Sequence, residues 1–335
     1  ASPHHPSSII IMDTATLALR STASAACWLL FHWALRPVVR RTSVEKLERG
    51  DWLNRVCGVV HATVAAVLSI RALLTEAPFP SMAWSILTLH GAPEDYVGAS
   101  GEPSPMLALI LPFTLGYFLY DLILMAIDPS LFMPVMVPHH VMAALFWPVA
   151  LQTASCQFYV HAMIATELST PFLHAAVFFL PRHGFKGAPL HIGCGLALVF
   201  VFFLARVLPI PFLAYSWWAS RAAFFALSTN LRYVCAVSLW VPMVMNVYWF
   251  HMLVAGALKQ LSKGDEDGDA QEGDADGDGQ SQGKGRSKSG GSKAKGEVLK
   301  SATSTPTGRK SLRKRQTPTA FEPGGDPREG DHIYN

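Results

Sequence analysis

Two adjacent histidines, His139 and His140, stand near the start of an otherwise apolar run, VPHHVMAALFW. Imidazole changes its charge near neutral pH, so it can serve as a general base or as a transient acyl acceptor. Two carboxylates also lie inside apolar stretches, Asp121 in TLGYFLYDLILM and Glu167 in ATELSTPFLHAA. We predict that His140 is the base and that Asp121 or Glu167 orients its ring. His139 completes this candidate catalytic group.

Helical spacing predicts which residues share a helix face with the histidines and carboxylates. His140 shares its face with Ala143, Ala144 and Trp147. Because small residues mark the side on which membrane helices pack, we expect His140 to point inward more than His139. The polar residues that we expect to contact a substrate are Arg55, His61, Tyr117, Tyr120, Thr170, His174, Asn246 and Trp249.

The elements that carry these residues are long apolar blocks. Half of the 335 residues are hydrophobic and only 15% are charged. A membrane-spanning helix needs about 20 mostly apolar residues. The sequence therefore predicts an all-α integral membrane protein with about seven transmembrane helices. These blocks lie near residues 15–37, 52–74, 106–127, 134–153, 155–180, 190–212 and 231–258.

The distribution of charge predicts how the chain crosses the membrane. Cytosolic segments carry an excess of Lys and Arg. Such residues follow the first block, separate the fifth from the sixth, and follow the seventh: Arg36, Arg40, Arg41, Lys46, Arg49, Arg182, Lys186, Lys259 and Lys263. The loop 75–105 contains four acidic residues and no Lys or Arg. We predict a lumenal N-terminus and a cytosolic C-terminus.

This orientation places the polar residues in one layer. With about 1.5 Å of rise per residue, His140, Asp121 and His61 each fall about 9 to 14 Å from the cytosolic ends of their helices. Glu167 is expected to lie deeper, whereas His161 falls near the opposite end of its helix. Four blocks also contain an internal proline, at Pro112, Pro148, Pro171 and Pro242. We interpret these bends and the shared depth as signs of an internal cavity.

The remaining segments differ in composition. We divide the chain into an N-terminal segment with the first helix (1–43), a membrane domain (44–261) and a disordered cytosolic tail (262–335), because the tail is too polar to bury a core. A basic cluster, 309–315, can contact anionic lipid. The five cysteines show no spacing typical of a zinc site or a disulfide framework, so we interpret them as small apolar fillers.

The motifs RVCGVVHA, LGYFLYDLILM, PHHVMAALFW, ELSTPFLH and NVYWFHM, in this order, resemble those of the TLC-domain family of multi-pass membrane proteins. The resemblance covers about residues 44–261 and implies a bundle of six helices around a lipid-accessible cavity, with the family's histidine pair at His139 and His140. Ceramide synthases in this family carry a His-Asp pair, a further Asp and a Glu after the double histidine. Here that region reads HAMIATELSTPF, so the sequence is more similar to the TLC-domain proteins that carry ELSTPF.

Two functions fit these residues. In the first, the protein binds lipid or acyl chains and influences membrane lipid composition or homeostasis, with membrane lipids as its partners. The alternative is an acyltransferase that uses acyl-CoA as co-substrate and His140 in a cytosol-facing cavity. We expect no metal, no other cofactor and no nucleic-acid partner. The oligomeric state stays open, and the resemblance implies an endomembrane location, in the endoplasmic reticulum or Golgi.

Other interpretations of the same residues are weaker. A transporter would use intramembrane Asp, Glu and His, but we find no internal repeat. A metal enzyme of the desaturase kind would need several His-x-x-His-His boxes, and the chain has a single His-His pair within its apolar blocks. Isolated histidines such as His61, His161 and His251 also fit a purely structural role as hydrogen-bonding groups between helices.

Overall fold

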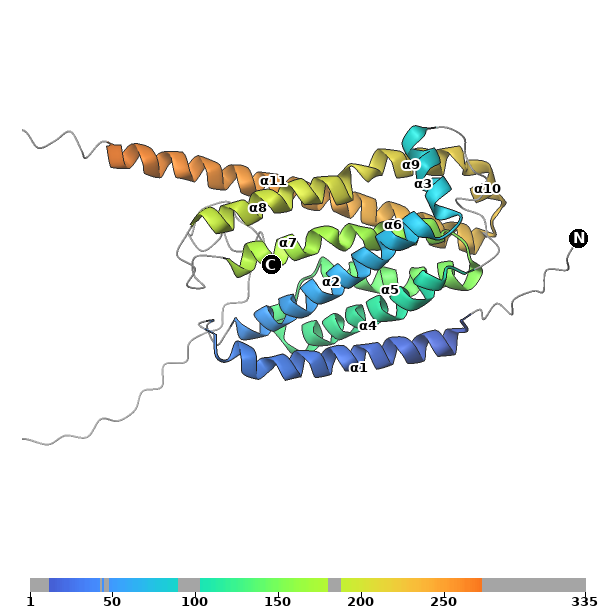
Figure 1. The fold of residues 1–335 in the computed structure, drawn as a ribbon, viewed down its shortest axis with the longest axis horizontal. Coiled ribbons are helices and arrows are strands. Elements are labelled where there is room, and N and C mark those ends of the chain that lie inside the picture. The colour runs from blue at the N-terminus through green and yellow to red at the C-terminus, as the bar shows by residue number, and fades with distance from the viewer. Residues whose placement is uncertain (1–11, 43, 45–47, 90–102, 180–187, 273–335) are drawn as a thin grey trace, which may run out of the picture. The chain divides into compact units, whose positions relative to one another are not determined.

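The computed structural model describes residues 12–42, 44, 48–89, 103–179 and 188–272, which form helices joined by short connections (Figure 1). Within these ranges there is no β-strand, which confirms the all-α prediction. The α-helices are α1 (Thr14–Val39), α2 (Arg49–Thr75), α3 (Phe79–Thr88), α4 (Pro105–Ile127), α5 (Met136–Thr153), α6 (Gln157–Ala165), α7 (Thr170–Phe178), α8 (Ala188–Phe202), α9 (Pro209–Ala219), α10 (Arg221–Ala226) and α11 (Thr229–Glu272). Three shorter turns are the 3-10 helices η2 (Pro129–Leu131) and η3 (Thr166–Ser169) and the π-helix η5 (Phe203–Val207).

Every predicted apolar block coincides with helix in the structure. Four helical segments of the described chain are long and apolar enough to cross a bilayer: Arg49–Thr75, Pro105–Ile127, Leu190–Ala219 and Thr229–Lys259. The remaining blocks correspond to α1, to the 18-residue α5 and to α6 with α7, which η3 separates. That these also cross the membrane, for a total of about seven, stays a prediction.

Local sequence sets where two of these helices begin. Asp13 precedes α1, and its carboxylate accepts a hydrogen bond from the Thr16 amide at 2.7 Å. Ser104 precedes α4, and its hydroxyl accepts from the Leu107 amide at 3.0 Å. Pro105 then fills the first helical position, where its missing N–H is not needed. Both helices therefore begin with satisfied backbone donors.

The prolines interrupt the helices less than the sequence suggested. Helices α4, α5 and α11 continue through Pro112, Pro148 and Pro242. Only Pro171 coincides with a break, because it lies at the start of α7 directly after the 3-10 turn η3. An additional irregularity precedes Pro209: the Leu208 amide donates to the carbonyl of Phe203, five residues back, at 2.8 Å. Pro209 itself has no N–H to continue the regular pattern.

The membrane helices pack on one another with small residues at close contacts. Helices α1 and α4 lie side by side (Figure 1), and Gly116 of α4 faces Ser24 and Ala25 of α1. A Cβ atom at Gly116 would lie 2.8 Å from the Ala25 amide nitrogen. The first helix, which we assigned to a separate N-terminal segment, thus packs directly against the membrane domain.

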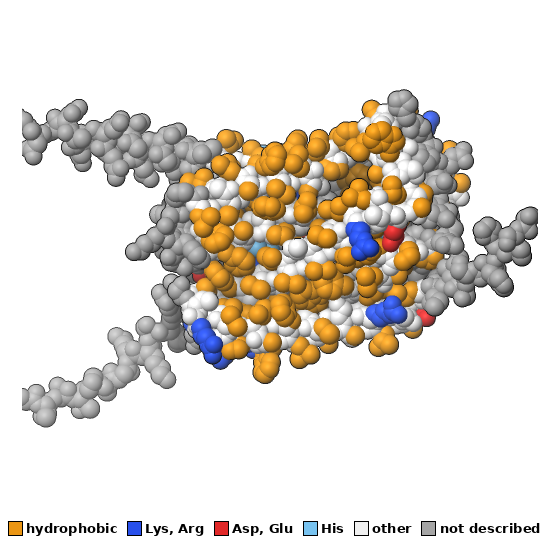
Figure 2. Space-filling view, viewed as in Figure 1, with side chains coloured by type: hydrophobic (Ala, Val, Ile, Leu, Met, Phe, Trp, Pro, Cys, Tyr) orange, Lys and Arg blue, Asp and Glu red, His pale blue; other side chains and the backbone are white. Residues whose placement is uncertain are grey.

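Apolar side chains cover most of the face of the helices that Figure 2 shows. Large exposed residues occur on several of them, including Trp33 at 66% exposure, Leu109 at 62% and Val244 at 67%. In water such a surface would be unfavourable, whereas in a bilayer lipid chains cover it. The surface therefore agrees with the membrane environment that the apolar blocks predict.

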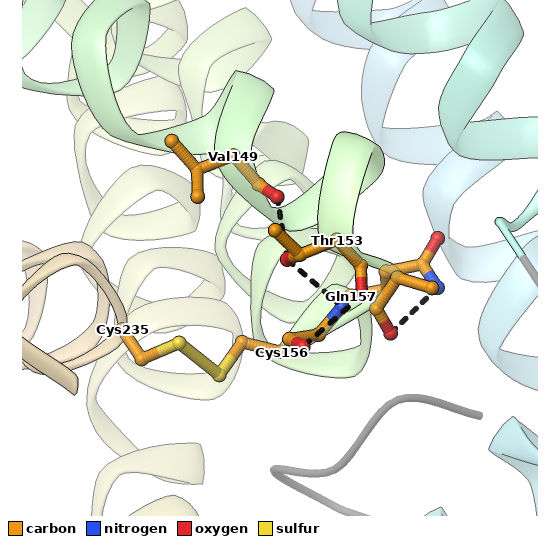
Figure 3. The surroundings of a disulfide bond; sticks show 7 residues. Val149, Thr153, Cys156, Gln157 and Cys235 are labelled. Carbon is orange, nitrogen blue, oxygen red and sulfur yellow. Dashed lines mark hydrogen bonds between the residues drawn. A yellow bond between two sulfur atoms is a disulfide. The ribbon is translucent and has the colours of Figure 1, made fainter. Parts of the chain in front are cut away.

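A disulfide joins Cys156 to Cys235, so the interpretation of all five cysteines as apolar fillers was wrong (Figure 3). The two residues are 79 positions apart in sequence, and their Cα atoms lie 6.3 Å apart. Cys156 precedes α6 in a left-handed backbone conformation, with φ of 60°, and Cys235 lies in the second turn of α11. Nothing in the spacing of the cysteines indicated this pair, because the two residues come together only in the folded chain, across 79 positions.

The chain divides into two units near the end of α11. By its internal contacts the chain forms two units, and the second begins at Ser262. Helix α11 continues past this point to Glu272, although we expected the disordered tail to begin at residue 262. Residues 273–335, which include the basic cluster 309–315, lie outside the described part of the chain.

We expect replacement of Gly116 by Ala to destabilise the protein by about 1–3 kcal/mol, because the added methyl group would force α1 away from α4. Gly193→Ala is the matched control: a Cβ atom there meets nothing within 4 Å. Thermal unfolding in detergent micelles should show a lower midpoint for Gly116→Ala alone. Equal midpoints for the two variants would contradict the close packing.

Candidate functional site

His140 and Asp121 form a buried pair between α5 and α4. The Nε2 atom of His140 lies 2.8 Å from Oδ2 of Asp121, and the residues are 2% and 5% exposed. The amide of Asn54, on α2, donates to the other carboxylate oxygen of Asp121 at 2.8 Å. The second ring nitrogen of His140, Nδ1, has no hydrogen-bond partner among the described residues. Nε2 of His140 is thus held by the Asp121 carboxylate, whereas Nδ1 is available to a ligand.

Aromatic contacts fix the rings of the histidine pair. The His140 ring stacks on Phe118 with centroids 4.4 Å apart, and the His139 ring lies 5.4 Å from that of His140. Trp249 of α11 meets His139 edge-on at 5.6 Å. Both histidines are buried, and His140, at 2% exposure, is slightly more so than His139, at 7%, in line with the expectation that His140 points inward more than His139. Trp249 thus gives His139 a contact with α11.

A second charged pair is built around Arg206. Its guanidinium donates to Ser169 at 2.7 Å, to Thr170 at 3.1 Å and to Asn246 at 3.1 Å. Glu167 lies 3.6 Å from the guanidinium and accepts a hydrogen bond from Thr170 at 2.6 Å. Arg206 is 7% exposed and lies in the π-helix η5, the type of irregularity that often marks functional sites.

Helix α1 contributes to the same layer. Nδ1 of His32 lies 2.8 Å from the hydroxyl of Tyr120, and both residues are buried. Trp28 contacts the rings of His61 and Tyr117 at 6.3 and 5.4 Å. These contacts place the first helix at the candidate site and not only at its periphery.

The α2 helix approaches α4 and α7 closely at Gly58. A Cβ atom there would lie 2.6 Å from Nε2 of His174 and 3.0 Å from the Tyr117 hydroxyl. One turn away, His61 stacks almost parallel on Tyr117, with centroids 4.0 Å apart and planes at 5°. Absence of a side chain at Gly58 therefore lets an imidazole from α7 reach the polar layer.

All twelve predicted site residues lie in this region, but their partners differ from the expected ones. Asp121, and not Glu167, contacts His140, while Glu167 interacts with Arg206. Arg55 is buried and forms an ion pair with Asp51, one turn earlier in α2, at 2.7 Å. The structure thus places the two predicted catalytic carboxylates in different ion pairs, Asp121 with His140 and Glu167 with Arg206.

His161 and His251 lie apart from the layer. His161 contacts Ser104 at 3.0 Å, and Ser104 also donates to Glu76, so this group forms a separate polar cluster at the start of α4. Its position agrees with the expectation that His161 belongs to the opposite end of its helix. His251 is exposed, on the surface of α11.

Sequence reasoning missed Arg206, His32 and Asn54. Arg206 had a readable signal, because it is the single charged residue in the apolar block 190–212 and a charge at that depth is costly. His32, in the first block, could have been noticed for the same reason. Asn54 lies at the edge of its block, where polar residues are common, and nothing in the sequence distinguishes it.

Comparison with known proteins agrees with this architecture. A family model of the TLC domain matches residues 51–255. The chain belongs to the TLC-domain family. It is therefore an integral, multi-pass membrane protein, and the matched range falls within the predicted membrane domain 44–261. Helix α1 lies outside the match, although it contributes Trp28 and His32 to the polar layer.

Curated relatives of this TLC-domain protein carry the same family name. TLC domain-containing protein 4-B of Danio rerio is 25% identical over 219 residues, which cover 63% of this chain and 75% of the relative. TLC domain-containing protein 4 of Xenopus tropicalis and protein 4-A of Xenopus laevis are each 29% identical over 166 residues, 46% of this chain and 61% of either relative. No solved structure matches the chain.

We expect Arg206→Met to destabilise this TLC-domain protein by about 3 kcal/mol, because Glu167 would keep a largely buried charge without its counter-ion. A second change, Glu167→Gln, should restore most of the loss, since it removes that charge. Thermal unfolding of the two single variants and the double variant measures the coupling. Arg221→Met is the control, because Arg221 is exposed and contacts only Trp218 in the described contacts. Additive effects of the two changes would contradict the ion pair.

Proposed function

We propose that the protein binds the polar end of a lipid or acyl chain in the layer around His140 and thereby influences membrane lipid composition. The observation that carries this proposal is the His140–Asp121 pair, which is buried among polar groups from α2, α4, α5, α7, η5 and α11. Buried polar groups are expensive in a bilayer and are retained mainly at functional positions. In a bilayer, lipid chains would surround the apolar outer surface of the helices.

An acyltransferase is the second candidate, and the geometry of His140 favours it. When Nε2 carries the proton that Asp121 accepts, Nδ1 has a lone pair that could take a proton from the hydroxyl or amine of a lipid acceptor. The carboxylate would then stabilise the imidazolium that forms. Acyl-CoA would be the acyl donor, with no other cofactor. Asp121 is better placed than Glu167 for this role, since Glu167 is engaged by Arg206 and Thr170.

Location and orientation are part of the proposal. We propose an endomembrane location, in the endoplasmic reticulum or Golgi, with a lumenal N-terminus and a cytosolic C-terminus. The Cys156–Cys235 disulfide supports this orientation, because the predicted threading places both cysteines at the lumenal ends of their helices. Disulfides persist in oxidising compartments such as the lumen and are rare in the cytosol.

Purification in mild detergent followed by mass spectrometry of the extracted lipids tests the binding proposal. We expect lipid to accompany the wild-type protein and to be depleted at least fivefold in His140→Ala, whereas His251→Ala, an exposed histidine, should retain it. His140→Gln is a second variant and should keep a thermal midpoint similar to that of the wild type. Lipid loss in this variant would therefore not be explained by misfolding. Incubation with labelled acyl-CoA and a panel of hydroxyl and amine lipids then separates the two candidates: turnover that requires His140 indicates the transferase. Equal lipid content in all variants would exclude the site.

Glycosylation tests the orientation. An Asn-x-Thr acceptor inserted within residues 90–102 should be modified in cells, whereas the same acceptor at the C-terminus should stay unmodified. A mass shift that is removed by an endoglycosidase reports each outcome. The reverse pattern would place the disulfide on the cytosolic side and overturn the proposed topology.

A further inference from the structure

Four nitrogen-bearing rings surround Phe118 in the middle of the polar layer. Their centroids lie 4.4 Å (His140), 5.7 Å (His61), 5.9 Å (His139) and 6.0 Å (Trp147) from that of the phenyl ring. They come from α2 and α5, while Phe118 belongs to α4. We call these five residues the Phe118 cluster. All of them are at least nine-tenths buried.

Each of the four outer rings has a nitrogen without a hydrogen-bond partner in the described part of the chain. These atoms are Nε2 of His61, Nδ1 of His139, Nδ1 of His140 and Nε1 of Trp147. A fifth such atom is Oγ1 of Thr114, one helical turn before Phe118 on α4. Buried polar atoms are almost always hydrogen-bonded, so five exceptions in one region point to a ligand that supplies the partners.

The chemistry of these atoms describes that ligand. The Trp147 N–H can only donate, a neutral imidazole nitrogen can donate or accept, and the Thr114 hydroxyl can do both. A hydroxyl or ester group on the ligand matches this mixture, because a hydroxyl also donates and accepts while an ester carbonyl accepts.

The charged groups near the cluster already have partners of opposite sign. Arg55 pairs with Asp51 at 2.7 Å, His140 with Asp121 at 2.8 Å, and Arg206 with Glu167 at 3.6 Å. A phosphate would therefore have to displace a carboxylate from one of the basic groups, and an ammonium would have to displace a basic group from a carboxylate. An uncharged ligand requires neither exchange.

We propose that the Phe118 cluster binds the headgroup of an uncharged lipid that carries hydroxyl and ester groups, such as an acylglycerol or a long-chain alcohol. This inference rests on the proposed lipid-binding function and narrows it to a ligand class. The headgroup hydroxyl lies against the imidazoles of His139 and His140, and the acyl chain extends toward the apolar outer surface. If the transferase candidate holds, this hydroxyl is the acyl acceptor: its oxygen bonds to the thioester carbonyl carbon of acyl-CoA and its proton passes to Nδ1 of His140. The C–S bond then breaks, and the imidazolium returns the proton to the sulfur, so that coenzyme A leaves as the thiol.

Binding of chain-matched lipids tests the proposal. The purified protein is titrated in detergent with a monoacylglycerol, the corresponding lysophosphatidic acid, a long-chain amine and a fatty acid, and affinity is measured from the shift of the thermal midpoint. We expect the monoacylglycerol to bind at least tenfold more tightly than each charged lipid. Tighter binding of a charged lipid overturns the inference but leaves lipid binding itself in place. If none of the four binds, the proposed function fails as well.

Two variants that each remove one polar atom test the cluster itself. Thr114→Val keeps the shape of the side chain and removes a hydroxyl that has no partner within the described residues, so the midpoint without ligand should change little. Trp147→Phe removes the unpartnered N–H but also part of a buried ring, so its midpoint without ligand should fall. Affinity for the monoacylglycerol should fall about five- to tenfold in each, the factor expected for one lost hydrogen bond. Trp217→Phe is the matched control, since Trp217 packs against Phe224 and lies outside the cluster. Unchanged affinity in both variants would show that another surface holds the headgroup.

Discussion

The structure depends on one constraint: charged groups inside the apolar helices must be neutralised by other groups of the same bundle. Arg206 of η5 meets Glu167 of η3, and His140 of α5 meets Asp121 of α4, so each of these pairs joins separate elements. Without water at that depth, a helix that moved away would leave an uncompensated charge in lipid. These pairs therefore fix the relative positions of several helices, and they do so at the candidate site.

The irregular helices follow from the same requirement. Arg206 reaches Ser169, Thr170 and Asn246 from a π-turn, and its acceptors include the end of a 3-10 turn. Both turns precede a proline that cannot complete a regular hydrogen-bond pattern, Pro209 in one case and Pro171 in the other. These irregular turns bring Arg206 of η5 to Glu167 and Ser169 of η3. The contacts hold the two turns in fixed positions at the candidate site.

Helix α1 changes how the domain is understood. It lies outside the residues that match the TLC-domain model, yet His32 holds Tyr120 and Trp28 packs on His61. Its close approach to α4 at Gly116 makes these contacts possible. The candidate site is thus formed by the family domain together with a helix that precedes it. The disulfide between Cys156, directly before α6, and Cys235 of α11 adds a covalent link between two further segments.

The sequence by itself indicated the all-α membrane architecture, the family and many of the polar residues of the candidate site, because apolar length, helical periodicity and the cost of charge in lipid can be read along the chain. It did not determine which partner each residue takes. Asp121, and not Glu167, holds His140, while Cys156 pairs with Cys235 across 79 positions. Arg206 and His32 were readable as polar residues in apolar blocks, but their roles depend on η5 and on the packing of α1. Pairing depends on the rotation and approach of whole helices, which only the tertiary structure fixes.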